Sequence, residues 1–197
     1  MRDRAERVGT MTQSKTDNQI GTRPIVLIGM MGAGKSSLGA RLAAELTLPF
    51  LDADAEIEKA AAMSIAEIFE KHGEAAFRDG ERRVIKRLLG EGPMVLALGG
   101  GAFIDDEVRA LVHEKAISIW LDVPLNELVR RVKKKPNKRP LLKGQNIEAR
   151  LTELMHQREP IYQQATLKVD VGGSSHEAAI ERLVDALRTH NAAPDNV

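Results

Sequence analysis

Short, mostly hydrophobic runs alternate along the chain with longer stretches in which hydrophobic residues recur every three or four positions. Short hydrophobic runs of this kind are typical of strands that are buried on both faces of a parallel sheet. Five such strands are predicted, at Pro24–Ile28, Pro49–Asp52, Met94–Leu98, Ala116–Leu121 and Thr166–Val171. Because helices must cover both faces of such a sheet, the pattern predicts an α/β fold.

The longer stretches have the spacing of amphipathic helices, as Leu38, Leu42 and Leu46 illustrate at intervals of four residues. Ser64 and Glu67 have the spacing of a capping box, which predicts a helix start. Helices are predicted at 35–46, 64–69, 74–89, 105–114, 124–134, 147–162 and 177–189. The expected buried face of the helix at 74–89 consists of Phe77, Val84, Ile85, Leu88 and Leu89.

The 197 residues suffice for one domain, which we place at residues 23–190. Residues 1–22 lack the apolar core of a secretory signal and are expected to be a disordered leader, and 191–197 a flexible tail. The net charge of +1 does not indicate a nucleic-acid or membrane-surface protein. The absence of cysteine excludes disulfides, thiolate metal sites and a cysteine nucleophile, and it favours a cytoplasmic location.

The first predicted strand leads into Gly-Met-Met-Gly-Ala-Gly-Lys-Ser at 29–36, which matches the phosphate-binding P-loop in full. The loop follows a strand and opens a helix, so its backbone N–H groups and the helix N-terminus can surround phosphate oxygens. Lys35 is expected to reach the β- and γ-phosphates, and the Ser36 hydroxyl to ligate Mg²⁺. The alternative is a glycine-rich turn that binds nothing.

Acidic and glycine-rich positions follow other predicted strands. Asp52 and Asp54 would point to the same side of an extended segment, where one carboxylate could lie near Mg²⁺ and the other accept a hydroxyl proton; the alternative is two solvated acids. Asp122 and Asp170 superficially fit a second metal-binding motif, but helix capping is the favoured interpretation. Gly99–Gly101 would let a ligand approach the backbone, unless it is a plain flexible turn.

Residues 130–143 contain eight basic residues and no acidic one. We interpret this segment as part of a mobile basic lid, at about 132–146, that closes over ATP and brings an arginine to the transferred phosphoryl group. A solvated basic surface and a nucleic-acid contact are the two alternatives.

Taken together and in this order, these motifs resemble those of the shikimate kinase family over about residues 23–188. The resemblance rests on six segments: Gly-Met-Met-Gly-Ala-Gly-Lys-Ser-Ser at 29–37, Leu-Asp-Ala-Asp at 51–54, Phe77-Arg78, Gly99–Gly101, Lys-Arg-Pro-Leu-Leu at 138–142, and Arg-Glu-Pro-Ile-Tyr at 158–162. The P-loop by itself is shared by many activities, whereas the six segments together are far more specific.

The resemblance implies a P-loop NTPase fold that transfers the γ-phosphoryl group of ATP to the 3-hydroxyl of shikimate. Asp54 would hold the reacting hydroxyls as the candidate base, and Arg78 and Arg158 would grip the substrate carboxylate, which suits the planar guanidinium. The implied catalytic residues are Lys35, Asp54 and Arg139. The implied shikimate-binding residues are Asp54, Arg78, Gly100 and Arg158.

ATP binding is implied for Gly32, Ala33, Gly34, Lys35, Ser36, Ser37, Arg131 and Arg139. Among these, Arg139 would contact the phosphates from the lid, and Arg131 would stack on adenine. Ser36 would bind Mg²⁺ directly and Asp52 through water. The loop at 172–176 carries glycine, serine and histidine where family members often carry Arg, Asn or Pro on the adenine side.

The expected partners are therefore ATP with Mg²⁺ and shikimate, in a monomeric enzyme that binds neither nucleic acid nor membrane. Two other functions are weighed against this prediction. A kinase for another sugar acid, such as gluconate, would keep the P-loop and the lid with a different substrate pocket. A P-loop regulatory module would instead bind nucleic acid through residues 130–143.

Overall fold

A five-stranded parallel sheet forms the centre of the computed structural model, which describes residues 22–134 and 146–192. The strands are β1 (Ile25–Ile28), β2 (Phe50–Asp52), β3 (Val95–Ala97), β4 (Ile117–Asp122) and β5 (Leu167–Asp170), and their order across the sheet is β2-β3-β1-β4-β5. All four neighbouring pairs are parallel. The predicted α/β fold with five parallel strands is confirmed.

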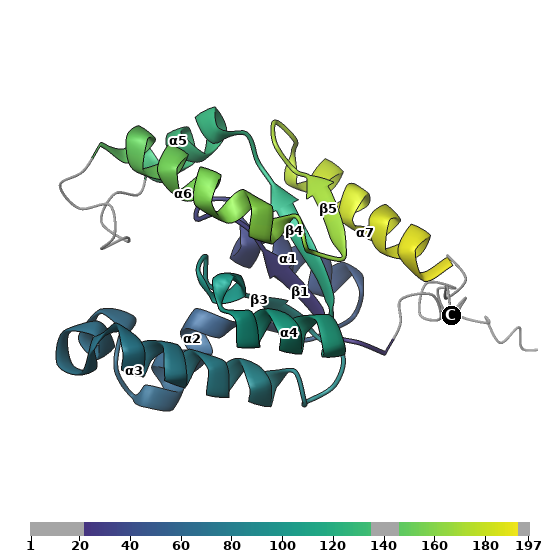
Figure 1. Cartoon of the computed structure of the whole chain (residues 1–197). Helices are drawn as coiled ribbons and strands as arrows, with labels where there is room; N and C mark the ends of the chain where they lie inside the picture. The colour runs from purple at the N-terminus through teal and green to yellow at the C-terminus, as the bar shows by residue number, and fades with distance from the viewer. Residues whose placement is uncertain (1–21, 135–145, 193–197) are drawn as a thin grey trace, which may run out of the picture.

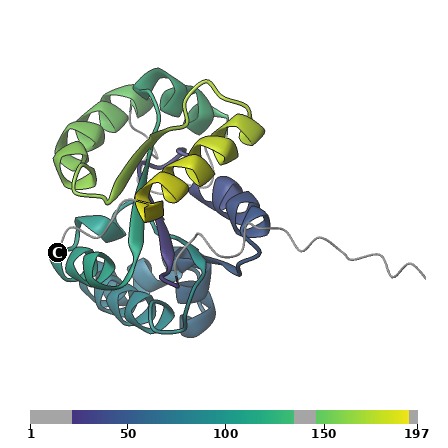
Figure 2. The same cartoon turned by 90° about the vertical axis from the view of Figure 1, so that its right-hand side faces the viewer.

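Helices lie on both faces of this sheet. They are α1 (Lys35–Glu45), α2 (Ala53–Ala61), α3 (Ile65–Leu88), α4 (Asp106–Lys115), α5 (Leu125–Lys133), α6 (Ile147–Tyr162), α7 (His176–Ala192) and the short 3-10 helix η1 (Ala102–Ile104). The helices α1 and α7 pack together on one side, whereas α4 and α6 lie on the other (Figure 1, Figure 2). The last helix extends two residues beyond the predicted end of the domain at residue 190.

The long element α3 contains both of the helices that the sequence predicts at 64–69 and 74–89. Gly73 separates them, because its φ of 79° and ψ of 174° are not helical angles. Ser64 and Glu67 form the predicted capping box at the start of α3. All five residues of the predicted buried face are buried.

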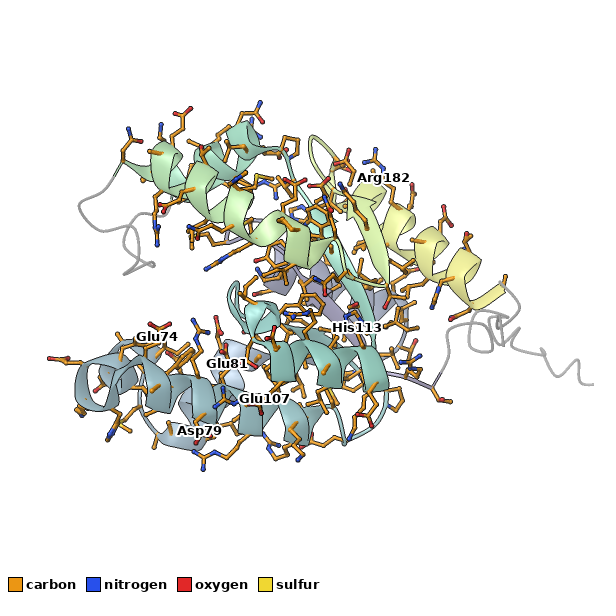
Figure 3. All side chains as sticks on the ribbon, viewed as in Figure 1. Glu74, Asp79, Glu81, Glu107, His113 and Arg182 are labelled. Carbon is orange, nitrogen blue, oxygen red and sulfur yellow. The ribbon has the colours of Figure 1, made fainter. Side chains whose placement is uncertain are left out.

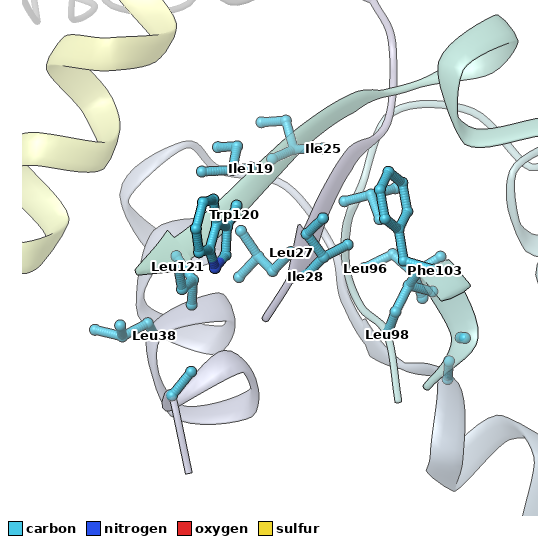
Figure 4. Close-up of a cluster of buried hydrophobic side chains, with 14 of the residues drawn as sticks. Ile25, Leu27, Ile28, Leu38, Leu96, Leu98, Phe103, Ile119, Trp120 and Leu121 are labelled. Carbon is cyan, nitrogen blue, oxygen red and sulfur yellow. The ribbon is translucent and has the colours of Figure 1, made fainter. Parts of the chain in front are cut away.

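The hydrophobic core fills the space between the sheet and its helices. Trp120 and Leu121 of β4 and Leu27 of β1 belong to this core (Figure 4). Directly after β1, Gly29 has a φ of +138°, and a Cβ atom there would lie 2.8 Å from the Leu121 carbonyl oxygen. Only glycine fits this point. The turn that opens the P-loop can therefore lie against the centre of the sheet.

The chain enters the sheet through Arg23, whose Nη2 donates to the carbonyl oxygens of His113, Glu114 and Ala116 at 3.2, 3.2 and 3.1 Å. Parts of three predicted segments lie outside the described residues. They are residues 1–21 of the leader, residues 135–145 of the lid, which include Arg139, and residues 193–197 of the tail. Within the described part of the chain, no helix combines the length and apolar composition needed to cross a bilayer.

Candidate active site

A cleft of about 1190 Å³ runs along the edge of the sheet where the strands end. One end is formed by the P-loop and the start of α1, and the other by residues of α2, α3 and the glycine loop at 99–101. Residues of α5, α6 and α7 complete the walls. Figure 1 shows α6 on one side of the sheet and α2 and α3 on the other side of the molecule. The predicted P-loop and the predicted substrate residues therefore share one cavity.

The P-loop bends sharply between β1 and α1. The Ala33 N–H donates to the Met30 carbonyl at 3.1 Å, and α1 begins at Lys35 with no side-chain cap on its first N–H groups. The Lys35 ammonium donates to the carbonyl oxygens of Gly29 and Met30 at 2.9 and 3.2 Å. The N–H groups and the ammonium together give this end of the cleft positive potential, which favours an anion.

Asp52 and Ser36 form a contact at the floor of the cleft. The Ser36 hydroxyl donates to Asp52 Oδ2 at 2.5 Å, and the Asp54 N–H donates to Asp52 Oδ1 at 3.1 Å. Asp52 is thus the N-cap of α2, and Asp54 lies in the first turn of that helix. The expectation that both acids lie on one extended segment is wrong. Both nevertheless line the cleft, because the helix starts there.

Asp54 lies in an environment that disfavours its charge. Burial raises the pKa of the Asp54 carboxyl, nearby Asp52 raises it further, and Lys35 and Arg78 oppose the rise. The neighbouring backbone comes so close that a Cβ atom on Gly99 would lie 2.7 Å from Asp54 Oδ1. A buried carboxylate with a raised pKa is a better proton acceptor than an exposed one.

Arg78 reaches the cleft from α3 and is held by two carboxylates of the same helix. Its Nη1 donates to Glu81 Oε2 at 2.6 Å, and its Nη2 donates to Glu74 Oε1 at 3.3 Å. The Glu81 side chain is only 2% exposed, and burial raises its pKa against the opposing effect of Arg78. Figure 3 shows Glu81 on the side of α3 that faces the sheet, and Asp79 on the opposite side. Glu81 therefore fixes the direction of the Arg78 guanidinium.

Sequence analysis missed Glu81, although a signal for it was present. Position 81 lies four residues after Phe77 and four before Ile85, so it falls on the buried stripe of α3. An acid on such a stripe is rare unless it is paired.

Arg158 reaches the opposite wall from α6. Its Nη1 donates to the Gly100 carbonyl oxygen at 2.8 Å, and the Tyr162 hydroxyl donates to the same oxygen at 2.6 Å. A Cβ atom on Gly100 would lie 3.6 Å from the Met31 N atom, so the glycine loop and the P-loop are neighbours. The structure thus brings Asp54, Arg78, Gly100 and Arg158 into the same cleft as the P-loop.

Arg131 lies under the P-loop, where its Nη1 donates to the carbonyl oxygens of Gly32 and Ala33 at 3.2 Å each. Its Nη2 also donates to Glu127 Oε1 at 2.7 Å, and Glu127 Oε2 accepts the Gly173 N–H at 2.7 Å. Glu127, which sequence analysis did not single out, therefore connects Arg131 with the loop before α7.

The start of α7 also lies close to the start of α1, because His176 Nε2 and the Ser37 hydroxyl are 3.3 Å apart. His176 also lines the cleft, together with Ser174 and Ser175. Three residues of the segment with unusual composition at 172–176 therefore line the same cavity as the P-loop.

The two other aspartates after strands do not line the cleft. Asp122 pairs with Lys168 at 3.1 Å, and α5 has no side-chain cap, so the prediction that Asp122 caps this helix is wrong. Asp170 accepts the Gly172 N–H at 2.8 Å and shapes a turn instead of capping a helix. The Asp122 carboxylate is thus paired with an ammonium group, and the Asp170 carboxylate accepts a hydrogen bond from an N–H group of a turn.

Two oxygen-bearing side chains beside the P-loop could help to hold a metal ion. Among residues 22–134 and 146–192, no group of three or more acidic, histidine or cysteine side chains could hold an ion. The Ser36 hydroxyl and the Asp52 carboxylate converge beside the P-loop. This donor set fits Mg²⁺, which binds through one or two protein oxygens together with waters and substrate phosphates.

Comparison with known proteins gives a consistent result. A family model described as shikimate kinase matches residues 31–188. A shikimate kinase of Bradyrhizobium diazoefficiens is 48% identical over 190 residues, which cover 96% of this chain and 91% of that protein. One of Caulobacter vibrioides is 54% identical over 170 residues, which cover 86% of this chain and 84% of that protein.

Solved structures add the arrangement in space. A shikimate kinase from Acinetobacter baumannii, in complex with shikimate, has a TM-score of 0.82 and 31% sequence identity, and the match covers 88% of this chain and 97% of that one. A gluconokinase from Sinorhizobium meliloti has a TM-score of 0.53 at 18% identity, covering 85% of this chain and 92% of that one. The second likeness concerns the fold alone.

Proposed function

We propose that this chain, which belongs to the shikimate kinase family, transfers the γ-phosphoryl group of ATP to the 3-hydroxyl of shikimate. The observation that carries the proposal is the single cleft, which has a P-loop at one end and two arginines beside a buried carboxylate at the other. The cationic end suits a triphosphate, and the paired guanidinium groups suit a small carboxylic acid.

At the ATP end, the backbone N–H groups of Gly32, Ala33 and Gly34 and the side chains of Lys35, Ser36 and Ser37 bind the phosphates. Lys35 stabilises the charge that moves onto the β–γ bridge during transfer, and it acts without reorganisation because the P-loop carbonyls hold it in place.

Two further arginines belong to this end. Arg131 lies beside the P-loop and supports the nucleotide, and stacking on adenine is its proposed contact. Arg139 remains the candidate for contacting the transferred phosphoryl group.

At the substrate end, Arg78 and Arg158 bind the carboxylate from opposite walls and thereby set the orientation of the ring. Glu81 holds Arg78, and the Gly100 backbone holds Arg158, so both guanidinium groups are positioned before the substrate arrives. The Gly100 N–H contacts the substrate as well. Binding the acid at one end leaves the opposite hydroxyls facing Asp54 and the P-loop.

Asp54 accepts the hydroxyl proton as the oxygen attacks phosphorus in line with the leaving ADP. Its raised pKa supports this role, since the carboxylate binds a proton more strongly than an exposed aspartate does. Positioning of the two reactants supplies the larger part of the rate, because transfer through a loose transition state demands little covalent assistance.

Ser36 is the proposed direct ligand of Mg²⁺, and Asp52 holds a water of its shell. The cation, when bound, neutralises charge on the β- and γ-phosphates. Asp52 has a second role that needs no metal, because it caps α2 and so fixes Asp54 at the start of that helix.

We also propose that the enzyme is a cytoplasmic monomer. The cytoplasmic location is supported by the sequence, which contains no cysteine that an oxidising compartment could pair. Light scattering after size exclusion would test the monomer directly.

The test of the activity is ADP release from Mg-ATP with shikimate, with gluconate and with no acceptor. Stimulation by shikimate alone, with the product identified as the 3-phosphate by phosphorus NMR, is the expected result. Lys35→Met serves as the control, since it should abolish release with every acceptor and thus exclude a contaminating kinase. Stimulation by gluconate instead would overturn the substrate assignment and leave the P-loop assignment standing.

A further inference from the structure

The motif Arg-Glu-Pro-Ile-Tyr ends in a tyrosine whose role the proposed function does not assign. Tyr162 is the last residue of α6 and is 2% exposed. Its ring lies 6.0 Å from the Trp120 ring in the core, and its hydroxyl donates to the Gly100 carbonyl oxygen at 2.6 Å. A residue buried in the core therefore reaches into the loop that lines the substrate end of the cleft.

Arg158 and Tyr162 lie four residues apart in α6, so their side chains leave the same face of the helix. Both donate to one acceptor, the Gly100 carbonyl oxygen, at 2.8 and 2.6 Å. Burial raises the pKa of the Tyr162 phenol, against the opposing charge and hydrogen bond of Arg158. The phenol consequently keeps its proton, and it can donate throughout the physiological pH range.

The loop that receives both donors contains three consecutive glycines at 99–101, and glycine has the least restricted backbone of all residues. The loop cannot orient its own peptide groups through side chains. A hydrogen bond from a rigid, buried phenol can orient the Gly100 peptide group. The carbonyl of that peptide in turn orients one end of the Arg158 guanidinium.

We propose that Tyr162 is a positioning residue for the substrate: by fixing the Gly100 carbonyl, its hydroxyl holds the Arg158 guanidinium where that group receives the carboxylate of shikimate. This inference rests on the proposed function. Tyr162 itself touches neither the substrate nor the nucleotide and acts through Arg158. The effect must then appear in the binding of the acid and not in the binding of ATP.

Tyr162→Phe tests the proposal because it removes the hydroxyl and keeps the ring against Trp120. Loss of one neutral hydrogen bond corresponds to about 3- to 10-fold in affinity. We expect the KM for shikimate to rise by that factor, while kcat and the KM for ATP stay within about twofold of the unmodified enzyme. This split follows because a contact far from the reacting hydroxyl contributes equally to the ground and transition states.

The methyl ester of shikimate shows whether the effect passes through the carboxylate. With this substrate, which lacks the charge that Arg158 binds, the phenylalanine variant and the unmodified enzyme should have equal KM values. An undiminished penalty with the ester would overturn the proposed route through Arg158. An unchanged KM for shikimate in an active Phe variant would overturn the positioning role altogether.

Two variants separate positioning from loss of stability. Leu154→Ala opens a cavity on the buried side of the same helix, and it should lower Tm more than Tyr162→Phe while the KM for shikimate stays unchanged. Replacement of Tyr162 with p-aminophenylalanine retains a weaker donor and should give an intermediate KM. If the phenylalanine variant does not fold, the p-aminophenylalanine variant decides. The proposal would be overturned if that variant has a lowered Tm but the same KM for shikimate as the unmodified enzyme.

Failure of the inference and failure of the proposed function give different results. If the unmodified protein releases no ADP on addition of shikimate, the proposed function is wrong, whatever the variants do. If it does so and the variant has the same KM for shikimate, only the role of Tyr162 is wrong. Isothermal titration calorimetry of shikimate into each protein gives an independent measure of its affinity.

Discussion

Replacement of Asp54 with asparagine should lower activity and raise stability at the same time. The substitution keeps the shape of the side chain and removes its charge and its capacity to accept a proton. A positioned general base contributes about 10²- to 10⁴-fold in rate, or about 3 to 5 kcal/mol of barrier. We expect kcat with shikimate to fall within this range, while ATP binding stays close to that of the unmodified protein.

The gain in stability follows from the direction of the pKa shift. Burial and Asp52 raise the pKa of Asp54 in the folded protein above its value in the unfolded chain. The carboxyl therefore stabilises the fold at pH values below the ordinary aspartate pKa, about 3.9, and this contribution is lost as the pH rises through the raised folded-state pKa. Asparagine undergoes no such loss. Its Tm should exceed that of the unmodified protein at pH 7, and the difference should shrink toward acid pH.

Coupled measurement of ADP release gives the rates, and thermal unfolding between pH 4 and 8 gives the stabilities. Glu56→Gln is the matched control, because it removes the same charge from α2 at a residue that pairs with Arg87 and does not line the cleft. The control should keep kcat within about twofold. A kcat for Asp54→Asn within tenfold of the unmodified enzyme would refute the role as base, and a lowered Tm at pH 7 would refute the electrostatic argument.

Three other substitutions test two residues of the site and one position outside it. Arg158→Lys should raise the KM for shikimate about tenfold or more and hardly affect ATP, since a point charge replaces a two-pronged donor; equal effects on both substrates would place Arg158 elsewhere. Gly99→Ala should reduce kcat at least tenfold, because its Cβ would lie 2.7 Å from Asp54 Oδ1. Unchanged kinetics there would show that the carboxylate can move. Gly80→Ala, in α3 with open space around its Cβ position, should raise stability by about 0.5–1 kcal/mol in denaturant titration without changing turnover.

The strands were predictable because a strand that is buried on both faces of a sheet consists almost entirely of hydrophobic residues. The hydrophobic run before the P-loop and the one at 94–98 differ from the observed strands only at their ends. The order of the strands across the sheet was not predictable in this way, because each buried strand has much the same composition and register depends on packing.

In the site, sequence identified the residues better than their local geometry. Asp52 and Asp54 line the cleft as expected, although a helix begins between them where an extended segment was expected. The position of Asp122 in the sequence is typical of a helix cap, but its carboxylate forms an ion pair with Lys168 of the neighbouring strand. Contacts between strands distant in sequence decide such cases, and a linear pattern contains no information about them.

The order β2-β3-β1-β4-β5 has a consequence for synthesis on the ribosome. The central strand β1 leaves the ribosome first, yet Ile25 pairs with Val95 and Ile117, which follow 70 and 92 residues later. At 5–20 residues per second, the second of these partners follows about 5 to 18 seconds later, and until then β1 lacks one of its two neighbours. An unpaired strand edge invites association with other chains. The topology that places the P-loop at the centre of the sheet thus leaves a hydrophobic strand of the nascent chain without a full set of neighbours until β4 emerges.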